Sequence, residues 1–519
     1  MRVLVFHGYL LRGTGSNVYN ARLCAALARL GHMVDLLSQE RRPEELGFVD
    51  AVGTWESGEA RVHVLREPVR VTAWRPEIGG LLPVYVADRY EGVEARTFLE
   101  ASDAEIDRYV AANVAAVRDV VARTPPDVAL ANHLVMGPLV LARGLEGSAP
   151  YEVKVHGSAL EYTVKRDPER FLPAAAEGLA GAAAVLVGSR HTAESLWAAM
   201  GDPGLSARTR LGPPGVDVDE FRPRPMAEAV GDVHALTAEL GARAGAEPLT
   251  GDSAFARDRA AVARALGSLD ASRDRHVAFV GKLIVSKGVD LLVAAWPLVV
   301  DRVPEARLVL VGFGGWRDAL GDLLGALVAG DLDRARAVAE AGREAEGGPR
   351  AALGHLLAFL DGLDGDERDA YLRAAARLDE RVVLTGRLDH HELAPLLALC
   401  DAEVVPSTFP EAFGMVAAEA AACGALPISA GHSGLAEVSA TLAAAVPAEA
   451  RPWLSFDVDD GAVHAIADRV VAWLRAPEEL RSRTREALVE VAQARFSWTG
   501  VAEGVIAAAS GRLDALPTP

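Results

Sequence analysis

The segment 406–437 combines residue types that hold anions and sugar hydroxyls. Pro410 and Gly414 disfavour helix ahead of residue 414, whereas the following run MVAAEAAACG favours a helix that ends at its glycine. We therefore expect Glu411 in the loop before this helix and Glu419 a little more than one turn inside it.

The start of this helix is expected to bind a diphosphate. The N–H groups of Phe413, Gly414 and Met415 face outward there, and a helix N-terminus attracts anions. At about 1.5 Å per residue, Glu419 lies roughly 7–8 Å below that end. One acid can then grip sugar hydroxyls and the other a ribose diol. Taken singly, Glu411 would be interpreted as a helix cap and Glu419 as a solvated surface acid, but the neighbouring features favour a binding site.

A basic loop, GKLIVSKG at 281–288, follows the apolar strand HVAFVG. Loops at the carboxyl ends of strands in open α/β sheets border the ligand crevice. Lys282 and Lys287 lie five residues apart on this loop, so both can reach one diphosphate. Two cations would stabilise the charge that develops as a nucleoside diphosphate leaves.

Two series of short apolar strands alternate with helical patterns, which predicts an α/β protein with two doubly wound, Rossmann-like domains. The strands of the first series are expected at 2–7, 33–38, 128–133, 151–155 and 183–187. Those of the second are expected at 276–281, 306–312, 382–386, 402–407 and 425–429. A glycine-bearing loop, 8–17, precedes the first helix at 18–30, and the Pro- and Gly-rich segment 211–224 is interpreted as a hinge. Residues 226–275 and 315–378 are interpreted as helical insertions with solvated charged faces.

The composition restricts the function classes. With 519 residues and a net charge of −19, the chain is expected to hold at least two domains and to bind no nucleic acid. We expect no transmembrane segment, and the three widely spaced cysteines suggest a reducing cytoplasm. The Asp-Val-Asp runs at 217–219 and 457–459 are interpreted as turns, so neither a metal site nor a cofactor is predicted.

The E-x7-E pattern of Glu411 and Glu419 resembles the donor signature of the family 4 glycosyltransferases, which have the GT-B fold. Four further segments resemble family elements: GKLIVSKG (281–288), LGPPGVDVDEFRP (211–223), RLDHHELAPLLALCDAEVVPS (387–407) and RFSWTGVAE (495–503). The similarity spans most of the chain outside the two insertions.

The resemblance implies an N-terminal acceptor domain at 1–215, against which a C-terminal helix at about 496–519 packs, and a nucleotide-sugar donor domain at 216–495, with a cleft between them. It implies that Glu411 contacts the hexose, Glu419 the ribose and Lys287 the diphosphate, with Lys282 where the family usually has Arg. The backbone at Arg387 and Leu388 would face the base, and the amides of Gly414 and Met415 the diphosphate. In the first domain, it assigns the following residues to the active-site histidine and the glycine-rich loop: His156, Gly13, Thr14, Gly15, Ser16 and Asn17. His133 ends another strand and is a second candidate for this site.

The expected activity is retaining, metal-independent transfer of a hexosyl group from a UDP- or GDP-linked sugar to a small-molecule, glycan or lipid-linked hydroxyl acceptor. The acceptor, the oligomeric state and the role of the insertions are left open. A sugar-nucleotide epimerase and an NAD-dependent oxidoreductase are the alternatives. The oxidoreductase interpretation is supported by GTGSN after the first strand and by Glu40 at the end of the second. The dinucleotide fingerprint is incomplete, because Val18 stands where its third small residue is required. A non-catalytic scaffold is disfavoured by the intact donor pattern.

Overall fold

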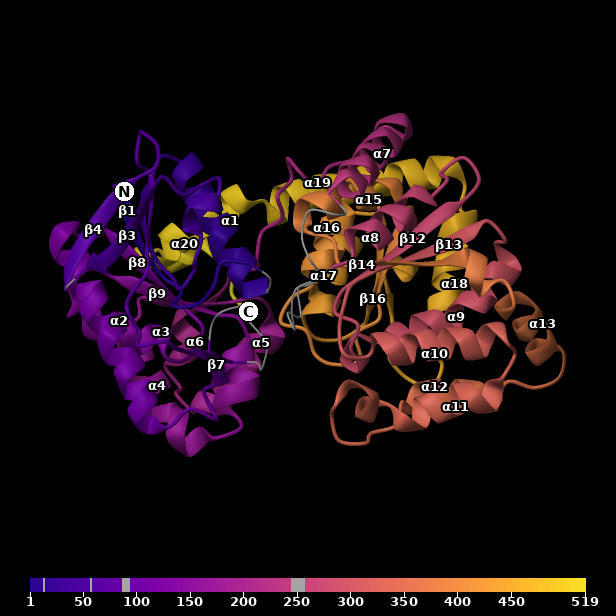
Figure 1. Cartoon of the computed structure of the whole chain (residues 1–519), viewed down its shortest axis with the longest axis horizontal. Coiled ribbons are helices and arrows are strands. Elements are labelled where there is room, and N and C mark those ends of the chain that lie inside the picture. Colours follow the sequence, from indigo (N-terminus) through magenta and orange to yellow (C-terminus); the bar gives the residue numbers. More distant parts are fainter. Residues whose placement is uncertain (13–14, 57, 86–93, 244–256) are drawn as a thin grey trace. The chain divides into compact units, whose positions relative to one another are not determined.

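The computed structural model describes residues 1–12, 15–56, 58–85, 94–243 and 257–519. The chain forms two compact units (Figure 1). Unit 1 comprises Met1–Gly215 and Phe496–Pro519, and unit 2 comprises Val216–Arg495. Each unit is built on its own mostly parallel sheet, as the two series of apolar strands predict.

The sheet of unit 1 has nine strands in the order β11-β10-β9-β8-β1-β2-β5-β3-β4, parallel except for the antiparallel pair β3–β4. These strands are β1 (Arg2–Phe6), β2 (Met33–Leu37), β3 (Ala51–Glu56), β4 (Glu59–Val64), β5 (Val71–Trp74), β8 (Val128–Asn132), β9 (Tyr151–Val155), β10 (Ala184–Val187) and β11 (Thr209–Leu211). A separate pair is formed by β6 (Leu81–Val84) and β7 (Glu94–Thr97).

Helices cover both faces of this sheet. They are α1 (Gly15–Arg29), α2 (Asp103–Arg123), α3 (Gly137–Leu145), α4 (Pro168–Ala180), α5 (Arg190–Met200), α6 (Leu205–Arg208) and α20 (Trp498–Ala509). Successive residues of a strand point to opposite faces, so Val3 and Val5 pack with α1 and α20, whereas Leu4 and Phe6 pack with α2 and α3. Figure 1 shows α20, from the far end of the sequence, among the elements of unit 1.

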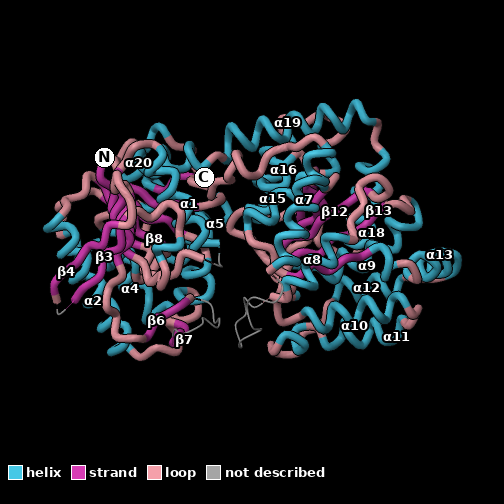
Figure 2. The backbone as a smooth tube through the Cα atoms, turned by 45° about the horizontal axis from the view of Figure 1, so that its top comes forward, coloured by secondary structure: helices cyan, strands magenta, loops and turns pink. Residues whose placement is uncertain are grey.

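The sheet of unit 2 has six parallel strands in the order β14-β13-β12-β15-β16-β17. They are β12 (Arg275–Val280), β13 (Ala306–Val311), β14 (Val382–Gly386), β15 (Ala402–Val405), β16 (Leu426–Ala430) and β17 (Ser455–Phe456). The main helices are α7 (Met226–Ala242), α8 (Arg259–Gly267), α9 (Val289–Arg302), α15 (His390–Leu399), α16 (Met415–Cys423), α17 (Ser433–Ala443), α18 (Ala462–Arg475) and α19 (Glu478–Phe496). The inserted segment 315–378 carries α10 (Arg317–Val328), α11 (Leu332–Ala341), α12 (Gly354–Gly362) and α13 (Gly365–Ala375), of which α10 and α11 lie side by side (Figure 2).

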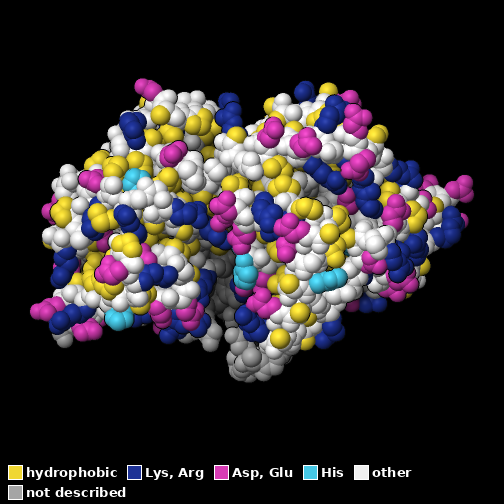
Figure 3. Space-filling model, turned by 90° about the horizontal axis from the view of Figure 1, so that it is seen from above, with side chains coloured by type: hydrophobic (Ala, Val, Ile, Leu, Met, Phe, Trp, Pro, Cys, Tyr) yellow, Lys and Arg dark blue, Asp and Glu magenta, His cyan; other side chains and the backbone are white. Residues whose placement is uncertain are grey.

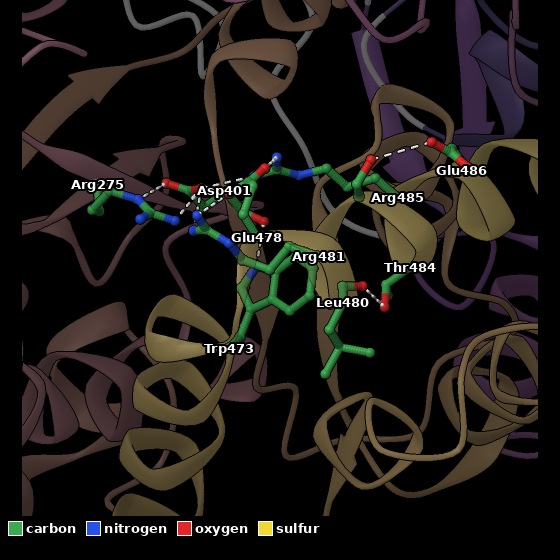
Figure 4. Close-up of polar contacts among 10 residues, drawn as sticks. Arg275, Asp401, Trp473, Glu478, Leu480, Arg481, Thr484, Arg485 and Glu486 are labelled. Atoms are coloured by element: carbon green, nitrogen blue, oxygen red, sulfur yellow. Dashed lines mark hydrogen bonds and ion pairs between the residues drawn. The ribbon is translucent and has the colours of Figure 1, made fainter.

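An ion-pair cluster around Asp401 fastens α19 to the sheet of unit 2 (Figure 4). Arg275, at the start of β12, donates two hydrogen bonds of 2.9 and 2.8 Å to the Asp401 carboxylate. Arg485 of α19 donates a third at 3.0 Å, and the Trp473 indole N–H donates to the Asp401 backbone oxygen at 2.7 Å. The cluster therefore joins α18, α19 and two strands at their amino ends.

Acidic and basic side chains are interspersed on the face shown in Figure 3. Elsewhere among the described residues, charged side chains form exposed ion pairs, such as Arg143 with Glu177 and Arg334 with Asp322. Exposed pairs of this kind contribute little to stability. We therefore expect a functional site among the charged side chains that lie at the ends of the buried strands.

Candidate functional site

The sheet of unit 2 reverses its strand order between β12 and β15. From β12 the chain continues outward through β13 to β14, whereas from β15 it continues the other way through β16 to β17. In open α/β sheets, ligands bind outside the carboxyl ends of the strands at such a point. The lysine loop follows β12 and the Glu411 loop follows β15, so both predicted segments border it.

The two loops pack directly against each other. The lysine loop forms a single 3-10 turn, Val285–Lys287, which ends at Gly288 with a φ of +66°. A Cβ atom on Gly288 would lie 1.9 Å from the Pro406 backbone oxygen, so this close approach requires glycine. Thr408 N donates to the Ser286 backbone oxygen at 3.0 Å, which joins the loops.

Lys287 and Glu411 form an ion pair where the loops meet. The Ser407 hydroxyl also donates to the Glu411 carboxylate at 2.7 Å, and Glu411 N donates to the Ser433 hydroxyl at 2.9 Å. The side chains of Lys287 and Glu411 remain 30% and 25% exposed, so a ligand can reach both. Glu411 does not cap α16, because the N-cap residue is Gly414 and makes no side-chain capping bond.

The first turn of α16 lies next to this ion pair in the sequence. Its first helical hydrogen bond runs from Ala418 N to the Gly414 oxygen, so the amides of Met415, Val416 and Ala417 precede the helical ladder. Such amides, together with the helix dipole, favour an anion. Gly414 is the N-cap and Met415 the first residue of α16, and Phe413 lies immediately before them.

Glu419 is buried inside α16, with only 2% of its surface exposed, so it is not a solvated surface acid. One of its oxygens bonds the His390 ring at 2.9 Å, and its other oxygen has no hydrogen-bond partner in the described part of the chain. Beside it, burial raises the pKa of Glu403 well above its usual range, and the nearby Glu419 charge raises it further. Glu419 therefore holds one buried acceptor oxygen without a partner among the described residues.

His390 was missed by the sequence analysis. It is the first residue of α15, whose N-cap Asp389 forms a capping box with Glu392. Arg387 donates to Asp389 at 2.6 Å, so its side chain closes this turn while Leu388 lies between them. A capping box is visible in the sequence D-H-H-E, but the contact of His390 with Glu419, 29 residues away, is not. We refer to Lys287, Ser407, Glu411, His390 and Glu419 as the lysine–acid site.

Lys282 lies at the start of the lysine loop, directly after Gly281. Leu283, its neighbour, is fixed by a hydrogen bond of 2.7 Å from its N–H to the Phe313 oxygen. The two predicted lysines therefore stand at opposite ends of one loop, and it is Lys287 that pairs with Glu411.

In unit 1, polar side chains gather at the carboxyl ends of β1, β8 and β9. His156 bonds the Asn132 side-chain oxygen at 2.7 Å, and Asn132 and Asn20 exchange hydrogen bonds of 2.7 and 3.0 Å. His7 bonds Asn20 at 3.0 Å and Asn17 at 3.0 Å. We refer to His7, Asn17, Asn20, Asn132 and His156 as the imidazole network.

The histidines of this region are held neutral. Burial lowers the pKa of His7 to about 4. Burial also lowers the pKa of His133 and of His156 well below the usual range, and the neighbouring histidines and Lys154 lower that of His156 further. Both ring nitrogens of His133 lack a hydrogen-bond partner among the described residues, and its ring lies 5.0 Å from that of His156.

The glycine-rich loop differs from its predicted form. Gly13 and Thr14 lie outside the described residues, and Gly15, Ser16 and Asn17 form the first turn of α1, which begins three residues before the predicted helix. The Asn20 amide donates to the Ser16 oxygen at 2.9 Å, and the Asn17 amide donates to the Arg12 oxygen at 2.6 Å.

Two family models match the chain. Residues 14–215 match the glycosyl transferase 4-like domain, and residues 357–488 match glycosyl transferases group 1. The D-inositol 3-phosphate glycosyltransferase of Segniliparus rotundus is 27% identical over 297 residues. That alignment covers 57% of this chain and 45% of the relative, so less than half of the relative's length is matched.

Solved structures agree over nearly the whole chain. Sucrose-phosphate synthase from Thermosynechococcus elongatus has a TM-score of 0.56 at 20% identity, with 99% of each chain covered. HepE from Anabaena, in complex with UDP and glucose, has a TM-score of 0.55 at 16% identity, covering 98% of this chain and 99% of that one. The catalytic domain of starch synthase IV from Arabidopsis thaliana, bound to ADP and acarbose, has a TM-score of 0.56 at 14% identity, with 98% of each chain covered.

Two mostly parallel α/β sheets and these likenesses define the GT-B fold. The two matched segments together span more than half of the chain, which belongs to the group 1 glycosyltransferases. None of the helices in the described ranges is both long and apolar enough to cross a membrane.

Proposed function

We propose that this glycosyltransferase moves a hexosyl group from a nucleoside diphosphate sugar to a hydroxyl acceptor, with retention at the anomeric carbon and without a bound metal ion. The observation that carries the proposal is the Lys287–Glu411 ion pair next to the start of α16, with buried Glu419 one turn deeper. A cation, a set of helix amides and two acids at a topological switch point match a diphosphate flanked by two sugars.

Each group has one task in this proposal. Lys287 and the amides at Gly414 and Met415 bind the diphosphate, aided by Lys282. Glu411 binds hexose hydroxyls, and Glu419, oriented by His390, binds the ribose diol. The backbone at Arg387 and Leu388 faces the base. Together they fix the anomeric carbon for attack, which is a large share of what an enzyme can contribute to transfer.

The transfer step follows from these charges. The bond between the anomeric carbon and the diphosphate oxygen breaks while the acceptor oxygen bonds to the same face of that carbon. The acceptor proton passes to the departing diphosphate, whose charge Lys287 and the α16 amides stabilise. This fixed positive charge takes the place of a metal ion. In unit 1, the neutral His156 ring is able to hydrogen-bond a sugar hydroxyl, and Gly15, Ser16 and Asn17 at the start of α1 are the other candidate residues of that unit.

The test is a product assay with UDP- and GDP-linked hexoses, starting with UDP-glucose. The acceptor panel includes inositol 3-phosphate, named in the matched relative, together with neutral sugars and a lipid-linked sugar. We expect a product with the donor's anomeric configuration, by NMR, at a rate that EDTA leaves unchanged. A donor isomerised without acceptor would indicate an epimerase, and bound NAD detected by mass spectrometry would indicate an oxidoreductase. Inversion, or loss of transfer with EDTA, would contradict the mechanism.

A further inference from the structure

The inserted segment 315–378 returns to the lysine loop and contacts it. After α11 the chain makes a short 3-10 turn, Arg343–Glu346. The carboxylate of Glu346 accepts a hydrogen bond of 2.9 Å from Val285 N, the first residue of the 3-10 turn that ends at Lys287. Neither family model covers this part of the chain, because the matched residues are 14–215 and 357–488.

Neighbouring residues hold the Glu346 side chain in the position from which it accepts the hydrogen bond of Val285. The Glu346 side chain is only 12% exposed, and a Cβ atom on Gly315 would lie 3.3 Å from the Glu346 Cβ, so the turn sits against the glycine pair that follows β13. Arg343 of the same turn pairs with the second Glu346 oxygen at 3.4 Å, which orients the carboxylate.

The other side of the lysine loop is held by the start of the same insertion. Trp316 N donates to the Leu283 oxygen at 3.0 Å, and its buried indole N–H donates to the Gly342 oxygen at 3.2 Å, next to the Glu346 turn. Gly314 approaches so closely that a Cβ atom there would lie 2.3 Å from the Leu283 oxygen. Leu283 is thus fixed by the start of the inserted segment and Val285 by the turn in its middle, so the loop between β12 and α9 is held at two points.

We propose that Glu346 is a positioning residue, through which the insertion holds the lysine loop in the shape that presents Lys287 to a diphosphate. The inference rests on the proposed function, since it assigns the diphosphate to Lys287. Val285 N is the leading amide of a one-turn 3-10 helix and has no acceptor within that helix, so the Glu346 carboxylate caps the turn and stabilises it. The turn in turn sets where the Lys287 side chain leaves the backbone.

The first experiment measures dissociation constants of UDP, GDP and ADP and of the matching nucleosides by calorimetry. For the nucleoside diphosphate that binds wild type, Glu346→Ala should raise the dissociation constant by about tenfold, which corresponds to the free energy of one lost hydrogen bond. The dissociation constant of the nucleoside should not change. Glu346→Gln, which retains an oxygen acceptor, should stay within about twofold of wild type. Glu344→Ala is the matched control, because it removes an exposed carboxylate from the same turn.

A double-mutant cycle separates positioning from general destabilisation. If Glu346 acts through Lys287, then Glu346→Ala should cost almost nothing further in a Lys287→Ala background. Additive losses, equal weakening of nucleoside and diphosphate, or wild-type affinity in Glu346→Ala would each overturn the proposal.

Hydrogen exchange on the ligand-free protein gives a readout that needs no nucleotide. The backbone amides of the peptide spanning 282–288 should exchange faster in Glu346→Ala than in wild type. In Glu344→Ala their exchange rate should equal that of wild type. Unchanged exchange in both would overturn the role of Glu346. If no nucleotide bound wild type but exchange rose in Glu346→Ala alone, the proposed function would fail while the hold of Glu346 on the loop would stand.

Discussion

The lysine–acid site of unit 2 and the imidazole network of unit 1 both lie at the carboxyl ends of parallel strands, yet they use opposite electrostatics. The first pairs an ammonium with carboxylates and leaves Lys287 and Glu411 partly exposed. The second is buried, and burial holds His7, His133 and His156 neutral. Charge suits a diphosphate, whereas neutral donors and acceptors suit sugar hydroxyls. Under the proposed function, the same topology serves two different kinds of ligand group.

The sharpest test of this contrast is His156→Ala. Loss of a catalytic contact typically costs at least about 100-fold in rate, so kcat should fall by that order while the dissociation constant for the nucleoside diphosphate stays within about twofold. Steady-state kinetics and calorimetry measure the two quantities. His63→Ala, which alters an exposed histidine on β4, should change neither. An equal loss of affinity and rate would contradict the division of tasks.

The converse change is Lys287→Ala. Hydrogen bonds to charged groups are worth about 1.5–3 kcal/mol, so diphosphate affinity should fall about 10- to 100-fold, with nucleoside affinity unchanged. Calorimetry with a nucleoside and its mono- and diphosphates measures this. Lys165→Ala, at a surface ion pair with Glu161, is the control and should bind like wild type. A loss that does not depend on the number of phosphates would break the comparison.

The buried network should also make unit 1 sensitive to acid. His7 has a folded pKa of about 4, below the unfolded value near 6.5, so the unfolded chain gains a proton that the folded one excludes. Stability is therefore complete well above pH 6.5 and falls as the pH drops, by about 1.6 kcal/mol for this group between pH 6.5 and 5. Urea unfolding at both values should show a smaller loss in His7→Gln than in wild type. The control His63→Gln should lose as much free energy of unfolding between the two pH values as wild type does. An equal loss in His7→Gln and wild type would contradict the role of His7.

The smallest expected effect is that of Glu419→Gln. It keeps the size of the side chain and an oxygen acceptor but removes the charge, so nucleoside and diphosphate should both bind about tenfold more weakly. Equal factors for the two ligands would distinguish Glu419 from Lys287 in the same calorimetric series. Weakening of the diphosphate alone would mean that Glu419 does not bind the ribose.

Much of the framework could be predicted because its signals are local. The runs HVAFVG and ARLVLVG gave strands within one residue of β12 and β13, and the helix after Gly414 runs over Met415–Cys423 as expected. Buried parallel strands are continuous apolar runs, and α16 ends at a glycine with a φ of +80°, so each stands out in a short window. The hairpin β3–β4 was missed, although EARVHV alternates polar and apolar residues, because β4 is a largely exposed edge strand without a continuous apolar run.

What the sequence determined was the set of elements and the residues at their ends, since apolar periodicity, glycine and proline act within a few positions. What only the tertiary structure decided was which of those ends meet. His390 touches Glu419 across 29 residues, Glu346 reaches Val285 across 61, and Lys287 pairs with Glu411 across 124. Such contacts depend on the order of the strands in the sheet and on the closing of long loops. The local propensity of the residues gives no information about either. For the same reason the insertion at 315–378, whose charged faces were interpreted as solvated, contributes a mostly buried carboxylate to the loop that bears Lys287.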